Sequence, residues 1–391
     1  MKVCLVHNSY GRRSGEEAAV DGLAECLVMK GHDVVHFDRT SEGLRERSSD
    51  KVAAFFSGIY SYARRREFAT FLSTHRPDII HINNLYPLIS PSILDEAVRF
   101  KIPAVMTLHN YRLLCPTGLL MVRDQICERC AQGAEWWCAI RNCTGERPKS
   151  VAYAVRNWVA KHRRSFNAIS RFVAPTYFVK SVMMRYGYAP DRIAVVPYVL
   201  NWDWTGLKAG VGKYVGFVGR ISPEKGIGVI IEAARLNPDI EFRFAGHHSQ
   251  MPQVVREAPR NCVFVGPVDR ARLGEFFADS RLIVFSSTWY ETCGISLLEA
   301  MAHGRAVIVS RLGAPAETIE NGRTGIYFAP GDAADLSDKI RYLWKLPELC
   351  RMMGQEAPAK VLRDFSPDRA YDGILKVYAT AIESENSSRP A

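Results

Sequence analysis

The sequence lacks the long apolar runs that membrane-spanning helices need. No window of about 18 consecutive apolar residues occurs among its 391 residues, so a transmembrane helix is not expected. Residues 1–8 are typical of a first strand and lack the apolar run and cleavage site of a signal peptide. With 47% hydrophobic and 24% charged residues, the composition excludes collagen-like, coiled-coil and disordered chains. We therefore expect a cytoplasmic protein with reduced thiols and about two or three domains.

Acidic residues are scarce in one segment of a moderately basic chain. Lysine and arginine number 51 against 41 aspartate and glutamate. Between Arg141 and Arg171, eight cationic residues face Glu146 alone, a net charge of +7. Such a block suits a phosphate-bearing partner, either lipid headgroups or nucleic acid. The alternative is a helix with a solvated basic face.

Short β-rich runs bounded by proline and glycine alternate with helical stretches, and this alternation restarts in the second half. Two complete alternations predict an α/β protein with two doubly wound domains, each built on a parallel sheet. We place the domains at 1–200 and 213–391, with a glycine-containing linker near 201–212. The expected strands are 2–6, 32–37, 78–82, 104–108, 173–174, 193–196, 214–218, 241–245, 263–265, 282–285, 306–309 and 325–328.

The last helical stretch, 368–385, carries one wide apolar stripe. Such a stripe needs a surface to cover. The pattern leaves open whether that surface belongs to its own domain or to the other one.

The first motif that carries chemistry spans residues 290–300. Glu291 should lie in a loop after a strand, and a helix should begin near Gly294. Glycine lets the backbone approach a ligand closely, and the N–H groups of a helix's first turn attract anions. Glu299, about one turn into the helix, could accept hydrogen bonds from sugar hydroxyls. The alternative is ordinary helix-start chemistry, because glutamate is common in a first turn.

The second motif spans residues 216–226, where a strand ends near Gly219 and a helix begins at Gly226. Arg220 and Lys225 place two cations on one strand-to-helix loop, which is where α/β sheets bind ligands. A guanidinium offers a planar fork and an ammonium a point charge. The pair could therefore hold a diphosphate.

Together the two motifs resemble those of the retaining glycosyltransferases of family 4, which have the GT-B fold. In that family a strand ends in Gly-Arg, Glu-Lys-Gly precedes a helix, and two glutamates follow eight positions apart. Residues 313–317 and 321–325 also look like the family's loops, and the resemblance covers most of the chain. The matching residues are Gly219-Arg220, Glu224-Lys225-Gly226, Glu291 and Glu299.

That resemblance implies two Rossmann-like domains facing across a cleft, with the acceptor side in the N-terminal domain. Arg220 and Lys225 would neutralise the diphosphate of a nucleotide-sugar donor. Glu299 would bind the ribose hydroxyls. Glu291 would hold the donor sugar together with the backbone at Gly294 and Ile295. Cys293 stands where many relatives have phenylalanine, so we expect a modest change in packing near the sugar.

The N-terminal half would supply the other wall of the site. Residues 11–17 look like the family's glycine-rich loop, with Ser14-Gly15 in place of the usual glycine pair. The backbone at Gly15 could approach the donor phosphate or the acceptor. His109 ends a strand and looks like the family's histidine that faces the donor sugar, although a lone histidine is more often structural. Asn83 and Asn84 end another strand and could line the acceptor side.

Four cysteines lie close together in an insert at about 112–148, with Cys115 as a possible fifth thiol. Four thiolates at this spacing could close a tetrahedral zinc site. A disulfide in an oxidising compartment and free buried thiols are the alternatives. The metal would be structural, because four sulfur ligands leave no open position for chemistry. The proposed ligands are Cys127, Cys130, Cys138 and Cys143.

These observations favour an enzyme: a retaining glycosyltransferase of the hexosyltransferase type. It would move a sugar from a nucleotide-diphosphate sugar to the hydroxyl of a glycan or lipid-linked acceptor, in surface polysaccharide or glycolipid biosynthesis. No cofactor is expected for catalysis, because the cations come from side chains. The alternative on the same fold is a nucleotide-sugar epimerase or hydrolase. A nucleic-acid-binding module is not expected, because it would leave both α/β halves unexplained.

A cell-surface product would bring the protein to the inner face of the membrane. Basic residues between 149 and 164 are interleaved with apolar ones. This pattern predicts a helix with a cationic side and an apolar side, which could lie on an anionic membrane as a peripheral contact. The alternative is a helix whose apolar side packs on its own domain.

Overall fold

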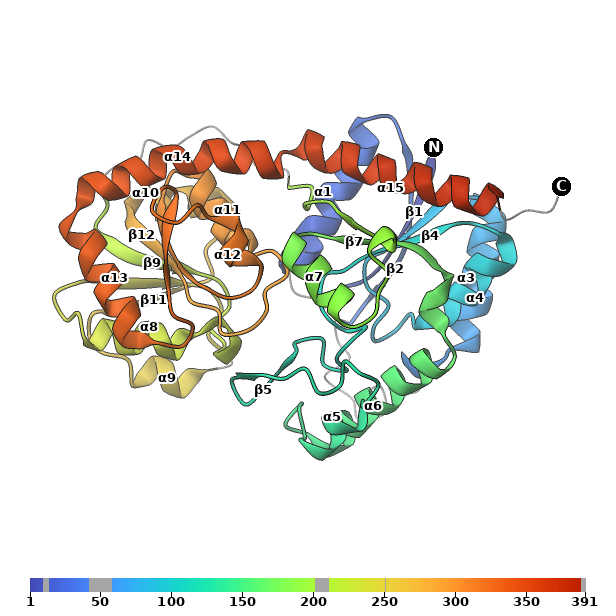
Figure 1. Cartoon of the computed structure of the whole chain (residues 1–391), viewed down its shortest axis with the longest axis horizontal. Helices are drawn as coiled ribbons and strands as arrows, with labels where there is room; N and C mark the ends of the chain where they lie inside the picture. The colour runs from blue at the N-terminus through green and yellow to red at the C-terminus, as the bar shows by residue number, and fades with distance from the viewer. Residues whose placement is uncertain (10–13, 42–57, 201–210, 250, 388–391) are drawn as a thin grey trace. The chain divides into compact units, whose positions relative to one another are not determined.

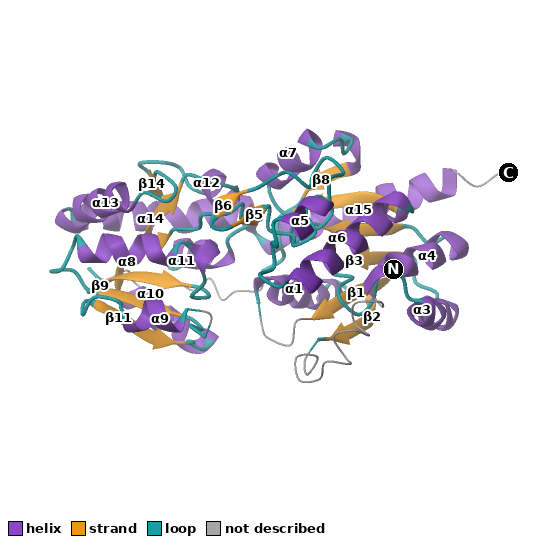
Figure 2. Ribbon diagram, turned by 90° about the horizontal axis from the view of Figure 1, so that it is seen from below, coloured by secondary structure: helices purple, strands orange, loops and turns teal. Residues whose placement is uncertain are grey.

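The computed structural model describes residues 1–9, 14–41, 58–200, 211–249 and 251–387. They form two compact units (Figure 1). Each unit contains a six-stranded sheet flanked by helices (Figure 2). The predicted α/β class with two parallel sheets is therefore confirmed. The first unit comprises Met1–Val122, Cys127–Asn201 and Phe365–Ala391, and the second comprises Arg123–Ile126 and Trp202–Asp364.

The first sheet has the strand order β2-β1-β3-β4-β7-β8, and its neighbouring strands run parallel. Residues 3–6 of β1, which lies between β2 and β3, have no exposed surface, as expected for a strand covered on both faces. The strands are β1 (Lys2–Ser9), β2 (Asp33–Thr40), β3 (Ile79–Ile82), β4 (Ala104–Thr107), β7 (Ile169–Ala174) and β8 (Ile193–Val195). The helices of this unit include α1 (Gly15–Met29), α3 (Tyr62–His75), α4 (Leu94–Phe100) and α7 (Tyr177–Arg185), with 3₁₀ turns at Pro91–Ile93, Ser165–Ala168 and Pro190–Arg192.

The second sheet has the order β11-β10-β9-β12-β13-β14, again with parallel neighbours. The strand order reverses between β9 and β12, which is where doubly wound sheets bind ligands. The strands are β9 (Tyr214–Val218), β10 (Phe242–Ala245), β11 (Cys262–Gly266), β12 (Ser280–Phe285), β13 (Ala306–Ser310) and β14 (Gly325–Phe328). The helices are α8 (Ile227–Arg235), α9 (Pro252–Arg256), α10 (Arg270–Asp279), α11 (Ile295–Ala302), α12 (Ala314–Thr318), α13 (Ala333–Lys345) and α14 (Pro347–Phe365), with a 3₁₀ turn at Pro223–Lys225.

The last helix, α15 (Pro367–Ser387), belongs to the first unit. Its apolar stripe, including Ile374 and Val377, is buried in one core with residues of β1, β3, β4 and β7. The Tyr378 hydroxyl also forms a 2.7 Å hydrogen bond with Nδ1 of the buried His81 on β3. The sequence division places residues 365–391 with the second domain, whereas the structure groups them with the first. The predicted linker at 201–212 lies largely outside the described residues.

The predicted insert contains few regular elements. It holds the short strands β5 (Met121–Val122) and β6 (Gln125–Ile126) and the helix α5 (Trp136–Ile140). The longer helix α6 (Arg147–His162) follows directly and lies beside α5 (Figures 1 and 2). In the described part of the chain, no helix is long and apolar enough to cross a membrane.

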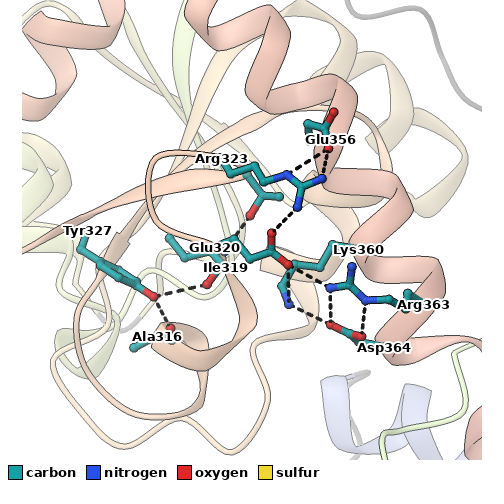
Figure 3. Close-up of polar contacts among 10 residues, drawn as sticks. Ala316, Ile319, Glu320, Arg323, Tyr327, Glu356, Lys360, Arg363 and Asp364 are labelled. Atoms are coloured by element: carbon teal, nitrogen blue, oxygen red, sulfur yellow. Dashed lines mark hydrogen bonds and ion pairs between the residues drawn. The ribbon is translucent and has the colours of Figure 1, made fainter.

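An ion-pair network ties the loop between α12 and β14 to helix α14 (Figure 3). Glu320 accepts from Arg363 at 2.9 Å, and Arg323 donates to Glu356 at 2.7 Å. The Tyr327 hydroxyl donates to the carbonyl of Ala316 at 2.6 Å. These contacts fix the segment 313–327, which follows β13 at the carboxyl end of the second sheet.

Candidate active site

The loops that follow β9 and β12 meet at the point where the strand order of the second sheet reverses. The backbone N–H of Thr288 donates to the carbonyl of Glu224 at 3.0 Å, and the Ser286 hydroxyl donates to the carbonyl of Lys225 at 2.7 Å. Gly226 has φ +68°, and a Cβ there would lie 2.0 Å from the Ser286 carbonyl oxygen. The two loops approach this closely because position 226 carries no side chain.

Lys225 and Glu291 form a largely buried ion pair between these two loops. Lys225 Nζ lies 2.5 Å from Glu291 Oε1, and the side chains are 19% and 7% exposed. The Ser287 hydroxyl donates to the same oxygen at 2.6 Å. Burial alone would raise the pKa of Glu291, but the Lys225 charge and these hydrogen bonds outweigh it and lower the pKa. Glu291 is therefore a carboxylate at neutral pH.

Arg220 differs from Lys225 in both burial and partner. Its side chain is 54% exposed, and Nη2 donates to Glu224 Oε1 at 2.9 Å. The Ser222 hydroxyl donates to the same oxygen at 2.8 Å. The structure therefore places both predicted cations on the loop after β9, each against its own carboxylate. Gly219 directly follows β9 with φ +153°, and its N–H donates to the carbonyl of Ala245 at 3.0 Å.

Gly294 starts helix α11, as the sequence predicted. Its φ is +87°, and a Cβ there would lie 3.2 Å from the Phe285 ring and 3.4 Å from Pro315. The first helical residue is Ile295, and the Gly294 carbonyl accepts from the N–H groups of Leu297 and Leu298. A helix start leaves its first N–H groups available to an anion. This helix start follows the loop that contains Glu291.

Glu299 and Cys293 occupy different environments around this helix start. Glu299 is partly buried one turn into α11, and its carbonyl accepts from His303 Nδ1 at 2.8 Å. Cys293 is only 2% exposed, and burial raises the pKa of its thiol. It is therefore a packing thiol and not a nucleophile.

Three contacts of Glu291 lay outside the sequence-based predictions, and one of them is its ion pair with Lys225. Ser287 donates to its carboxylate, and the N–H of Ala314 donates to its backbone carbonyl at 3.3 Å. Its position in the sequence could have indicated Ser287, since this residue follows a buried strand on the ligand-binding edge. The approach of the segment 313–317 depends on the path of the chain after β13, and sequence spacing does not give that path.

In the first unit, His109 lies among polar side chains at the carboxyl ends of β3 and β4. Its Nε2 is 2.9 Å from Asn83 Oδ1 and its Nδ1 is 3.1 Å from the Tyr198 hydroxyl. Its ring stacks on Tyr198 with 5.2 Å between ring centroids. Burial, with smaller contributions from His7 and His81, lowers the pKa of His109 well below its ordinary value. His109 is therefore neutral at physiological pH.

Asn84, the other asparagine predicted to line the acceptor side, does not contact His109 in this way. Its side chain donates to the backbone carbonyl of Asn8 at 3.0 Å.

His7 is a buried and Glu16 a partly buried titratable residue, and the motif comparison singled out neither. His7 Nδ1 lies 3.9 Å from Glu16 Oε1, and these atoms have no hydrogen-bond partner among the described residues. Burial raises the pKa of Glu16 to about 8, although the Arg112 charge lowers it in part. Gly15, the predicted ligand-contacting glycine, is the first residue of α1. Residues 11–13 of the predicted loop lie outside the described residues.

The described cysteines of the insert form no disulfide bond. Cys130 and Cys138 are buried in a small apolar cluster with Ala154, and Cys143 is partly buried against it. Across the described residues, no group of three or more His, Cys, Asp or Glu side chains is arranged to hold a metal ion. The zinc prediction for Cys127, Cys130, Cys138 and Cys143 therefore gains no support from the structure. It stays a prediction based on spacing.

Comparison with known proteins assigns a family to the chain. Residues 13–201 match Glycosyltransferase Family 4 and residues 201–360 match Glycosyl transferases group 1. A glycogen synthase of Mycobacterium tuberculosis is 28% identical, over 95% of this chain and 92% of the relative. An uncharacterized 42.6 kDa protein in the cps region of Klebsiella pneumoniae is 23% identical, over 80% of this chain and 86% of the relative.

The fold agrees with this assignment. The crystal structure of Anabaena HepE in complex with UDP-glucose aligns with a TM-score of 0.65 and 16% identity, over 99% of this chain and 100% of that chain. At this identity the likeness concerns the fold alone. The double α/β architecture, the two family matches and the motifs on the ligand-binding edge of the second sheet agree with one another. The chain is therefore a glycosyltransferase with the GT-B fold, and it belongs to the glycosyl transferases group 1.

Proposed function

We propose that the enzyme transfers a hexose from a nucleotide-diphosphate sugar to an acceptor hydroxyl, with retention at the anomeric carbon. The observation that carries this proposal is the Lys225–Glu291 pair, held at 2.5 Å between the two loops at the strand-order reversal of the second sheet. A buried cation beside a helix start suits a diphosphate, and a fixed carboxylate beside them suits a sugar hydroxyl. The relatives support a nucleotide-sugar donor, because the HepE structure holds UDP-glucose.

The proposed reaction breaks the bond between the sugar C1 and the oxygen of the donor's β-phosphate. Negative charge grows on that phosphate, where Arg220, Lys225 and the N–H groups at Gly294 and Ile295 would meet it. The acceptor oxygen bonds to C1 on the face that the phosphate leaves, and the acceptor proton passes to the departing phosphate. Glu291 would hold the donor sugar.

The remaining predicted residues would bind the substrates and would not take part in the bond change. Glu299 would accept hydrogen bonds from the ribose hydroxyls. The neutral His109 would face the donor sugar as a hydrogen-bonding group. Gly15 would let the backbone approach the donor phosphate or the acceptor, and Asn83 would line the acceptor side.

We further propose that the acceptor is a glycan or a lipid-linked sugar, in the synthesis of a surface polysaccharide or glycolipid. The glycogen synthase relative supports a glycan acceptor. The proposed location is the cytoplasm, at the inner face of the membrane. Support for a membrane contact comes from the basic segment between Arg141 and Arg171.

The first experiment identifies the donor and the reaction. Nucleoside diphosphates are screened for thermal stabilisation, and the matching nucleotide sugar is then incubated with and without glycan acceptors. Proton NMR of the product should show the donor's anomeric configuration. Inversion would contradict the retaining mechanism. Conversion of the nucleotide sugar without any acceptor would instead indicate an epimerase or hydrolase.

The second experiment separates the two glutamates. Calorimetric titration of the nucleoside diphosphate should show weaker binding to Glu299→Ala and nearly unchanged binding to Glu291→Gln, because Glu291 is assigned to the sugar. Glu291→Gln should mainly lower kcat. Equal losses of nucleotide affinity in both variants would show that these roles are wrongly divided.

A further inference from the structure

Helix α6 buries three polar side chains and two alanines and leaves three large apolar side chains exposed, unlike an ordinary surface helix. Its buried residues include Ser150, Arg156 and Asn157. Arg156 is only 5% exposed, donates to the carbonyl of Pro116 at 2.8 Å and lies over the ring of Tyr86. Asn157 donates to a backbone carbonyl at 2.7 Å. The inner face of α6 therefore holds the loop after β4 through hydrogen bonds, whereas surface helices usually bury an apolar stripe.

The apolar residues of α6 lie on its outer face. Val151, Val155 and Trp158 are 48%, 39% and 52% exposed. They follow one another at spacings of four and three residues, so they form one stripe along the helix. The neighbouring helix α5 exposes Trp136 and Ile140, 55% and 65% exposed and one turn apart. We call these five side chains the α5–α6 apolar surface. Five exposed large apolar residues on two adjoining helices indicate an interaction site.

Cations surround this surface. Arg147 lies one turn before Val151 on the same face of α6, and Arg164 lies two residues beyond the end of the helix. Within the described parts of the chain, neither has an ion-pair partner. Lys149 and Arg163 are 46% and 47% exposed and face single carboxylates at 3.5 and 3.6 Å. Exposed pairs at such distances neutralise little, so the rim is positively charged.

We propose that the α5–α6 apolar surface docks onto an anionic lipid bilayer. Tryptophan favours the membrane interface, and exposed cations favour anionic headgroups. A helix with this pattern lies in the plane of the interface with its apolar side chains among the acyl chains. A second copy of the chain fits less well, because an isologous contact would bring two segments of net charge +7 together. The inference builds on the proposed function, since a lipid-linked acceptor is presented at such a surface.

Vesicle sedimentation tests the docking. The full-length protein is mixed with phosphatidylcholine vesicles, with and without phosphatidylglycerol. We expect binding only to the anionic vesicles, and weaker binding as salt increases. Removing one cation should weaken binding about fivefold, the equivalent of about 1 kcal/mol. Arg147→Glu with Arg164→Glu should therefore lose more than tenfold, and Val151→Ser with Val155→Ser and Trp158→Ser should abolish binding.

Matched controls come from the second unit. Leu236→Ser with Tyr342→Ser and Met352→Ser removes three side chains that are 54%, 52% and 53% exposed. Arg256→Glu with Arg260→Glu reverses two exposed cations. Both controls should bind anionic vesicles as the unaltered protein does. The proposal would be overturned by equal binding of all variants or by no binding of the unaltered protein. It would also be overturned if the protein bound no vesicles and the serine variant lost a dimer that the unaltered protein forms.

Activity without vesicles separates this inference from the proposed function. All variants should transfer sugar to a soluble acceptor at the unaltered rate, because none of the changed residues lies in the proposed site. Vesicle binding without any sugar transfer would contradict the proposed function and leave the docking surface standing. Sugar transfer without any vesicle binding would contradict the docking surface and leave the proposed function standing.

Discussion

Lys225 and Glu291 depend on each other because both are largely buried. A buried ion pair adds little net stability, yet removing one partner leaves an uncompensated charge and is costly. We therefore infer that the pair serves to hold two charges in fixed positions on the ligand-binding edge of the sheet. A donor diphosphate would find a cation already held in place by the carboxylate that is assigned to the sugar.

We expect Lys225→Ala and Arg220→Ala each to lower sugar transfer about 100-fold or more. Each deletes a charge that would counter the leaving phosphate, on the order of 3 kcal/mol by analogy with lost oxyanion donors. Steady-state rates with the identified donor measure the loss. Lys213→Ala is the control, because this lysine is 76% exposed and faces Asp279 at 3.3 Å in the same unit. Turnover equal to that of the control would contradict the diphosphate assignment.

Glu16 predicts a dependence of stability on pH. Its pKa is raised from an ordinary 4.5 to about 8 in the folded protein, so the unfolded chain loses this proton first. The contribution of Glu16 to the free energy of unfolding is therefore present below about pH 4.5 and is lost as pH rises to 8. Glu16→Gln stays neutral and avoids this loss. Urea unfolding should show the variant gaining stability over the unaltered protein between pH 5 and 8.

The exposed Glu383 of the same unit provides the control for this pH dependence. Glu383→Gln should shift stability equally at each pH, since it changes no buried carboxyl group. A constant difference between Glu16→Gln and the unaltered protein across this pH range would contradict the raised pKa.

Single residues were predictable where a motif supplied their context. Gly294 starts its helix, as the sequence predicted. The contact between Lys225 and Glu291 was not predicted, because the motifs gave these residues separate roles at the diphosphate and at the sugar. His7 and Glu16 could not be found in this way. Their environment results from packing at the end of β1. The pair Glu16-Glu17 at a helix start does not reveal that Glu16 is the residue with the raised pKa.

At the scale of elements, Gly226 allows the loops after β9 and β12 to touch. We expect Gly226→Ala to destabilise the second unit by about 3 kcal/mol or more, because a Cβ would overlap the Ser286 carbonyl and φ is positive there. Gly228→Ala, within helix α8, meets no atom within 4 Å. That control should stabilise by up to about 1 kcal/mol. Thermal unfolding of both variants decides the matter, and equal midpoints would contradict the close approach.

The cysteine insert gives a prediction that the described structure leaves open. If the four cysteines share a zinc ion, reduced and desalted protein should contain about one metal per chain, and Cys130→Ser should lose it. Elemental analysis measures this. Cys262→Ser is the control, because that thiol belongs to the second unit, far along the chain from the insert. A metal-free preparation with residues 127–143 ordered would contradict the zinc site.

Element types followed from the sequence more reliably than element orientations. The strand positions depend on buried β-rich runs, which local sequence reveals. Local sequence does not reveal which side of α6 faces the domain. Its apolar and cationic residues suit either packing on the domain or contact with a partner. Buried Arg156 decides it, since its hydrogen bond to Pro116 requires a loop that is distant in sequence.

At the scale of the whole molecule, the two units are not two consecutive halves of the chain. The chain completes the second sheet and then contributes its last helix to the first unit. A division at the linker alone could not show this, because the stripe of α15 would suit either sheet. The buried hydrogen bond between Tyr378 and His81 supplies the specificity that the apolar stripe lacks.

We therefore expect the first unit to need α15 in order to fold. Val377→Asp places a carboxylate in a core that includes residues of β1, β3, β4 and β7, where Val377 is 5% exposed. An unpaired buried charge costs at least several kcal/mol, so the first unit should unfold at a much lower temperature or fail to fold. Ala379→Asp is the control, because it adds the same charge to an exposed position of the same helix. Calorimetry should show that nucleotide still stabilises the second unit in both variants, because the residues assigned to the nucleotide belong to that unit. An unchanged transition of the first unit in Val377→Asp would contradict the placement of α15.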